Sequence, residues 1–90
     1  MSATLSPGEE LLVPERVVVA PTLGVFRLLP PGTGASLGDP VAKGQAVGLL
    51  LASGEEVVVE SAFDGVFMGT LAVEGERVRE GQPVAWLRAS

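Results

Sequence analysis

From residue 16 onward, short apolar runs alternate with turn residues along the whole chain. Runs of four to eight apolar and β-branched residues are separated by Gly, Pro and Asp, a pattern typical of short strands joined by tight turns. No stretch keeps the 3.6-residue period of a helix. Twelve glycines and seven prolines are spread through the sequence, and they leave no window for a long helix. The pattern therefore predicts an all-β domain.

Two blocks of sequence occur twice, in the same order. Val19–Phe26 aligns with Glu60–Phe67, and each block ends in Gly-Val-Phe. Further on, Gly38–Leu50 aligns with Gly75–Leu87, and both follow the pattern G-[DE]-x-V-x-[KE]-G-Q-x-V-x-x-L. Turns of similar composition could produce one such match by convergence. They explain less well two separate matches that occur in the same order. The chain is therefore predicted to contain two halves built on one motif.

The two halves differ in the length of one loop. The first block recurs 41 residues later and the second block 37 residues later, so the first half carries four extra residues. These fall within Leu29–Ser36, a segment rich in Pro and Gly whose composition predicts a loop.

Each half predicts the same succession of elements. A valine run forms a strand, a glycine allows a sharp reversal or a close backbone approach, and a turn with two glycines suited to positive φ follows. The last strand of each half is expected at Ala46–Ala52 or Pro83–Arg88. Packed about a pseudo-two-fold axis, the halves predict a flattened β-barrel or sandwich of two antiparallel sheets.

The valine runs leave apolar side chains on two faces. In the first run, Val17 and Val19 face one side of the strand and Val18 the other, and Val57–Val59 repeats the arrangement. If one face is core, the other is still apolar. Either the sandwich closes over both faces, or an exposed strip meets a partner.

Three aromatic residues, Phe26, Phe67 and Trp86, are expected in the core. Phe67 aligns with Phe26, and Trp86 aligns with Leu49. Positions that are apolar in both halves are most simply buried between the sheets.

The N-terminal residues differ from the rest. Residues 1–14 start polar and are expected to form a tail that precedes a domain over residues 15–90. Within this segment, Leu11–Val13 is expected to pack as a short edge strand that Pro14 ends.

Composition and charge narrow the function classes. Ninety residues make one domain. The chain has no Cys and no His, which removes disulfides, thiolate metal sites and Ser-His or Cys-His nucleophile pairs. The net charge of -5 argues against nucleic acid and anionic membranes as partners. With no apolar run long enough to span a bilayer and no signal-peptide pattern, the expected location is the cytoplasm.

The hydrophobic content is high for so small a domain. Apolar residues make up 47% of the chain, and the mean hydropathy is +0.42. Both values indicate that a protein partner or a second copy covers part of the surface.

The repeated motifs resemble the biotinyl/lipoyl domain family, with the closest likeness to the biotin carboxyl carrier protein of acetyl-CoA carboxylase. Ala20–Phe26 resembles its A-P-M-x-G-x-F opening, and Val41–Gln45 resembles the turn before its hairpin strand. Glu60–Val66 and Gly81–Val84 resemble later strands, so the likeness covers about residues 16–88. It implies the barrel-sandwich hybrid fold, with the extra loop where the carrier has its thumb.

The resemblance also locates where the family carries its cofactor. There, a lysine within E-A-M-K-M at a hairpin tip binds biotin or lipoate through an amide bond. In this chain the tip aligns with Leu51–Glu55, and Gly54 stands at the position of the lysine. Ser53 and Glu55 replace the flanking methionines. Ser53-Gly54 suits a two-residue hairpin turn, so we expect the hairpin tip, Ala52 to Glu55, without its attachment site.

Other candidate sites are weaker. Lys43, the only lysine, lies in a turn before the hairpin strand, and Glu80 replaces it in the second half. An open turn rarely supplies the six or so oxygen ligands of a hard cation, so Glu55, Glu56 and Glu60 are not expected to bind metal. Gly32–Gly34 lacks the lysine and helix that follow a phosphate-binding loop.

No catalytic constellation is found, so the chain is not expected to be an enzyme. The leading hypothesis is a non-biotinylated carrier-like domain, with no cofactor, that acts as a protein-interaction or scaffold module associated with an acyl-CoA carboxylase complex. The alternative is a genuine biotin or lipoyl carrier of acetyl-CoA carboxylase in fatty acid biosynthesis, modified at Lys43. A third hypothesis is a small-molecule binder between the halves, for which the sequence offers no specific ligand groups.

Overall fold

The computed structural model describes residues 15–89 as eight strands and no helix. The expectations for residues 1–14 lie outside the described residues. The strands are β1 (Glu15–Val19), β2 (Gly24–Arg27), β3 (Pro40–Val41), β4 (Ala46–Ala52), β5 (Glu55–Glu60), β6 (Gly65–Thr70), β7 (Arg77–Val78) and β8 (Pro83–Arg88).

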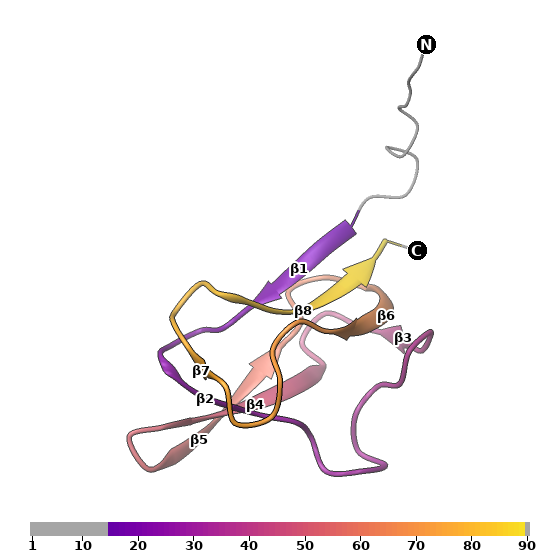
Figure 1. Ribbon diagram of the computed structural model, residues 1–90. Coiled ribbons are helices and arrows are strands. Elements are labelled where there is room, and N and C mark those ends of the chain that lie inside the picture. The colour runs from indigo at the N-terminus through magenta and orange to yellow at the C-terminus, as the bar shows by residue number, and fades with distance from the viewer. Residues whose placement is uncertain (1–14, 90) are drawn as a thin grey trace.

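The strands form two four-stranded antiparallel sheets that pack on each other (Figure 1). The strand orders are β1-β8-β6-β3 and β5-β4-β2-β7. Exchanging β1 with β5, β2 with β6, β3 with β7 and β4 with β8 converts one order into the other. The predicted all-β sandwich with internal pseudo-two-fold symmetry is therefore confirmed.

The symmetry extends to the pairing register. Val17 pairs with Trp86 between β1 and β8, and the equivalent Val58 pairs with Leu49 between β5 and β4. A register irregularity also lies at the same place in both pairs, between Val18 and Val19 and between Ala46 and Gly48. The hairpin β4–β5 thus corresponds to the pairing of the first and last strands.

The Gly-Gln turns join the two halves. The N–H of Gly44 donates to the Ser61 carbonyl at 2.7 Å, and the N–H of Gly81 donates to the Ala20 carbonyl at 2.8 Å. Both glycines have positive φ, 89° and 86°, as the repeated pattern predicts. Because each half supplies donors to the other, neither half completes its backbone hydrogen bonds alone.

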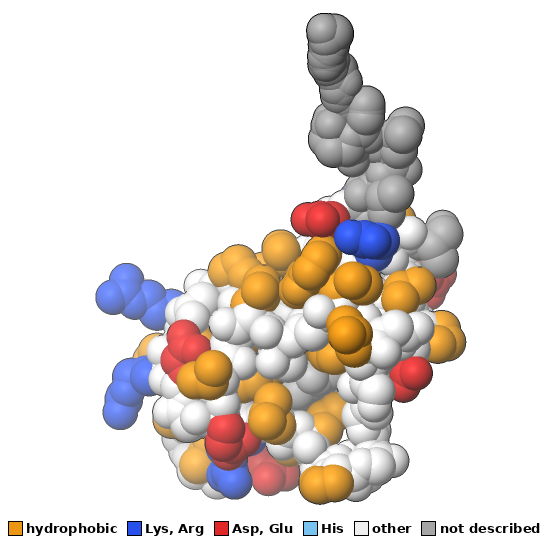
Figure 2. Space-filling model, turned by 45° about the vertical axis from the view of Figure 1, so that its right-hand side comes forward, with side chains coloured by type: hydrophobic (Ala, Val, Ile, Leu, Met, Phe, Trp, Pro, Cys, Tyr) orange, Lys and Arg blue, Asp and Glu red, His pale blue; other side chains and the backbone are white. Residues whose placement is uncertain are grey.

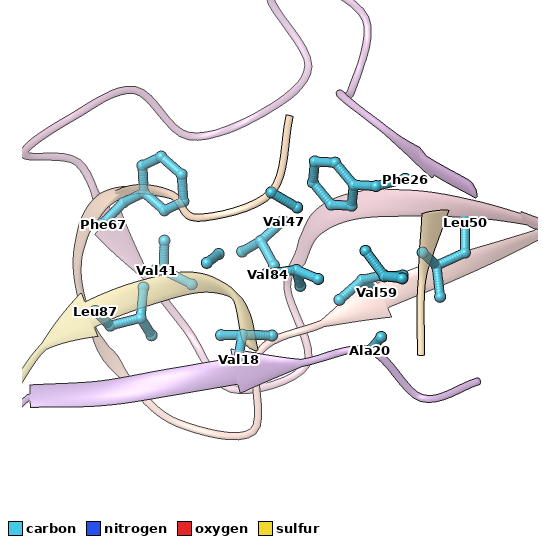
Figure 3. Close-up of a cluster of buried hydrophobic side chains, with 13 residues drawn as sticks. Val18, Ala20, Phe26, Val41, Val47, Leu50, Val59, Phe67, Val84 and Leu87 are labelled. Carbon is cyan, nitrogen blue, oxygen red and sulfur yellow. The ribbon is translucent and has the colours of Figure 1, made fainter. Parts of the chain in front are cut away.

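The core lies between the sheets and draws equivalent residues from both halves (Figure 3). Phe26 and Leu50 come from one half, and Phe67 and Leu87 hold the matching positions in the other. Burial of each such side chain contributes about 1.5–3 kcal/mol. The remaining buried apolar residues are Val18, Ala20, Val41, Val47, Val59, Ala72, Val78, Val84 and Ala85.

Ser61 is the buried polar side chain of this core, with 2% of its surface exposed. Its hydroxyl donates to the Phe63 carbonyl at 2.6 Å and accepts from the Phe63 N–H at 3.1 Å. The hydroxyl is thus satisfied locally, and its burial carries no unpaired polar group.

The extra residues of the first half form a loop, as predicted. No strand occurs between Arg27 and Pro40. This loop is tied to the second half by Glu74, whose carboxylate accepts from the Leu28 N–H at 2.8 Å and from the Arg27 guanidinium. These two contacts hold the pKa of Glu74 below its ordinary value, first through the Leu28 N–H and then through the Arg27 side chain.

Candidate functional site

The hairpin between β4 and β5 ends in the predicted two-residue turn. Ala52 pairs with Glu55, which leaves Ser53 and Gly54 as the loop. Their φ angles are 52° and 81°. Positive φ at both central residues defines a type I′ turn, the geometry that best matches the twist of paired strands.

The tip presents a hydroxyl and a carboxylate but no amine. Ser53, Gly54 and Glu55 are exposed. A Cβ placed on Gly54 meets nothing within 4 Å, so neighbouring atoms do not exclude a side chain at this position. The hairpin therefore forms without a side-chain amine that could carry biotin or lipoate through an amide bond.

Lys43 lies elsewhere in the fold. It sits in the turn between β3 and β4, and its backbone N–H donates to the Asp64 carboxylate at 2.8 Å. The seven residues of β4 separate this turn from the hairpin tip, a span of roughly 20 Å at the usual rise per residue. The structure therefore does not bring Lys43 to the tip.

The other candidate groups form no chemical centre. Within residues 15–89 no group of three or more Asp, Glu, His or Cys residues could hold a metal ion. Residues 32–34 form part of the loop, where the Thr33 hydroxyl donates to the Pro30 carbonyl at 2.6 Å. A cavity of about 390 Å³ lies between this loop and Phe67. Its lining is mainly aliphatic, with backbone and hydroxyl groups and no charged side chain.

The valine runs expose apolar side chains on the outer faces of both sheets. Val18 is buried, whereas Val17 is 46% exposed and Val19 43% exposed. On the other sheet, Val59 is buried and Val58 is 47% exposed. The predicted alternation of side chains is confirmed. The outer faces of the two sheets, which carry Val17, Val19 and Val58, are not covered by other parts of the domain.

Trp86 lies outside the core, so the expectation that it is buried between the sheets is wrong. Its neighbours Ala85 and Leu87 are fully buried, whereas Trp86 is half-buried on the outer face beside Val17. The alternation of side chains along a strand could have given this orientation, since Leu87 points inward. Leu49, the equivalent of Trp86, is also half-buried and pairs with the exposed Val58.

Trp86 lines a shallow hollow that sequence reasoning missed. Glu15, Val17 and Leu71 complete its lining, and its volume is about 320 Å³. Hydrophobic side chains gather over one face of the molecule in Figure 2, with an acidic and a basic side chain at its upper edge. Leu71 comes from the segment after β6, so no local pattern in the sequence places it beside β1.

Comparison with known proteins gives a fold and no sequence family. No family model matches the chain, and no curated protein matches it. Among solved structures, the chain is similar to part of a single-chain, multi-domain long-chain acyl-CoA carboxylase, with a TM-score of 0.69 and 19% identity. It is also similar to part of the urea carboxylase of Kluyveromyces lactis, with a TM-score of 0.70 and 23% identity.

The likeness covers nearly all of this chain and a small part of each enzyme. It spans 100% of this chain and 8% of the acyl-CoA carboxylase, and 97% of this chain and 7% of the urea carboxylase. The chain thus has the fold of one small segment of these multi-domain enzymes. Residues 15–89 contain no helix long and apolar enough to cross a bilayer.

Proposed function

We propose that the chain is a non-biotinylated domain of the biotin carboxyl carrier type that acts as a protein-interaction or scaffold module associated with an acyl-CoA carboxylase complex. The observation that carries the proposal is the hairpin tip. The type I′ turn is kept, while Gly54 offers no amine at the position where the family resemblance puts the attachment lysine.

Two lines of support favour the carboxylase setting. The repeated motifs resemble a carboxyl carrier, and both structural neighbours are carboxylases. The motif likeness concerns short stretches of sequence, and the structural likeness concerns the path of the whole backbone; both point to carboxylases. Exposed apolar residues on both outer faces, such as Val17 and Val58, suit a module that works through protein contacts.

The absence of acylation is tested by intact-mass measurement. The full chain is incubated with biotin protein ligase, biotin and ATP, and in parallel with lipoate ligase and lipoate, beside an authentic carrier domain as positive control. The proposal expects no change in mass for this chain while the control gains one biotin or one lipoate. A stoichiometric gain in this chain would overturn it.

A carrier modified at Lys43 is the second candidate function. It is favoured by the exposed position of Lys43 in a turn, where a ligase could reach the amine. A gain in mass that disappears in Lys43→Arg would establish this candidate. A gain that persists in the variant would contradict both functions.

The carboxylase association is tested by affinity capture of the full chain from the source cell. Quantitative mass spectrometry is expected to show carboxylase subunits enriched over a capture with an unrelated domain of similar size. Their absence at matched recovery of the bait would overturn this part of the proposal.

A further inference from the structure

The two outer faces hold equivalent positions, yet they differ in chemistry. Val17 and Val58 are equivalent and equally exposed, at 46% and 47%. Next to them, Val19 on β1 corresponds to Glu60 on β5. Trp86 lines the hollow of the first face, whereas the smaller Leu49 takes its place on the second. The β1–β8 face therefore has the larger apolar side chain and an additional valine, whereas the β5–β4 face has Leu51, 40% exposed, in the place of Arg88.

The charges on the β1–β8 face are balanced. Glu15 pairs directly with Arg88, two residues beyond the pairing of Val17 with Trp86. Because side chains alternate along a strand, all four lie on the outer face. One acidic and one basic group thus stand side by side at one end of an apolar strip.

The equivalent face on β5 and β4 lacks this balance. Glu56 takes the place of Glu15, but it pairs with Leu51 in the position of Arg88. Glu60 adds a second negative charge further along β5. Under the same kind of two-fold rotation Glu56 would face Leu51 and Glu60 would face Ala46 of the other copy. The β5–β4 face thus offers these carboxylates no opposite charge in a second copy.

We propose that the β1–β8 face binds a second copy of this chain. The inference deepens the proposed function by naming the occupant of one interaction face, and it holds whether or not any residue is acylated. The two-fold axis lies in the interface, between β1 and β8 and parallel to them. This arrangement places Val17 of each copy on Trp86 of the other, and Glu15 of each copy on Arg88 of the other.

Self-complementarity selects a second copy over a foreign protein. In a two-fold interface, if one residue contacts a second residue of the other copy, that second residue also contacts the first residue of the other copy. The patch must therefore be complementary to itself. On the β1–β8 face, one two-fold rotation brings Val17 onto Trp86 and Glu15 onto Arg88 of the other copy. The chain as a whole carries a net charge of -5, which disfavours contact between most of its other surfaces.

Sedimentation velocity of the full chain tests the pairing with a matched pair of variants. Wild type is expected to show a concentration-dependent dimer. Val17→Lys is expected to weaken the dimer about tenfold or more, as loss of a central apolar contact does. Val58→Lys, equally exposed at the equivalent position, is expected to dimerise like wild type. Far-UV circular dichroism checks that both variants keep the fold.

A charge-swap experiment keeps the proposal falsifiable if Val17→Lys fails to fold. Glu15→Arg alone and Arg88→Glu alone each bring like charges together across the axis, so each is expected to be mainly monomeric. Mixed in equal amounts, the two variants restore both opposite-charge contacts and are expected to form a heterodimer.

Three results would overturn the pairing. Wild type that stays monomeric at several hundred micromolar would do so, as would equal effects of Val17→Lys and Val58→Lys in folded protein. Charge-swapped variants that fail to associate when mixed would also do so. None of these results bears on acylation, which the intact mass reports separately.

Discussion

The carbonyl oxygen of Leu51 lies 2.9 Å from the point where a Cβ on Gly24 would stand. The same relationship recurs in the second half, where the Arg88 carbonyl oxygen lies 2.8 Å from a Cβ on Gly65. Contacts this short are not tolerated by real side chains, and both oxygens belong to the backbone. The glycines at the starts of β2 and β6 therefore set how closely the neighbouring strands approach.

Gly24→Ala is expected to destabilise the domain. The added methyl group must push β2 away from β4, and overpacking of this kind costs about 1–3 kcal/mol. Urea denaturation followed by circular dichroism measures the loss. Gly34→Ala is the control, because its added methyl meets the flexible side chain of Leu29 in the loop. An equal loss of stability in both variants would contradict the explanation.

Ser53→Asn is expected to stabilise the hairpin. Ser53 has a φ of 52°, a left-handed conformation that costs an L-residue about 1–2 kcal/mol and that Asn adopts more readily. Asn-Gly is also the preferred pair for a type I′ turn. The expected gain is a few tenths of a kcal/mol to about 1 kcal/mol, measured as a rise in the urea midpoint. Ser53→Val, which is β-branched, is expected to lower the midpoint, and a rise there would exclude backbone conformation as the cause.

The contact between Glu74 and the loop is expected to weaken in acid. The Leu28 N–H and the Arg27 side chain lower the pKa of Glu74 from 4.5 in the folded chain. A lowered carboxyl pKa adds stability above the unfolded value, and this stability is lost as the pH falls through the folded value. The thermal midpoint of Glu74→Gln is therefore expected to approach that of wild type below pH 4.5.

The matching control for this pH dependence is Glu80→Gln, which removes one negative charge from an exposed turn. Its thermal midpoint is expected to run parallel to that of wild type over the same pH range. If Glu74→Gln runs parallel as well, the hydrogen bonds to Glu74 do not contribute to acid sensitivity.

Leu50→Ala and Leu87→Ala are expected to be equally harmful. Both side chains are fully buried at equivalent positions, and such truncations cost about 2–5 kcal/mol. Because the halves exchange backbone hydrogen bonds and share one core, each variant is expected to lower a single thermal transition. Two separate transitions, by circular dichroism and tryptophan fluorescence, would show that the halves unfold independently.

The repeat predicted much of the fold from sequence. It placed the strands at Ala46–Ala52 and Pro83–Arg88, and it assigned positive φ to the turn glycines. These features follow from local pattern, because each depends on residues within a few positions of one another. The short strands β3 and β7 were expected as part of a turn, since two-residue strands leave no periodic signal.

The features that sequence reasoning missed join distant residues or break the symmetry. Arg27 and Glu74 meet across the two halves, and no repeated position corresponds to this pair. The orientation of Trp86 was missed because aligning the halves shows which residues are equivalent and not which face they occupy. The alignment of the sequence shows that Gly54 stands where the family has its lysine. The hollow beside Trp86 could be found only from the three-dimensional structure, because Leu71 and Val17 are distant in sequence.

The equivalence of the β4–β5 hairpin with the β1–β8 pairing has a consequence for how this fold can be reconnected. Glu15 lies beside Arg88 as Glu56 lies beside Leu51, so a short turn that joins the end of β8 to the start of β1 would close the domain into a ring. Cutting that ring at Ser53-Gly54 would yield a circular permutant in which the former hairpin tip becomes the pair of chain ends. The fold thus has two equivalent places where the backbone can be interrupted: between Arg88 and Glu15, and at the hairpin tip between Leu51 and Glu56.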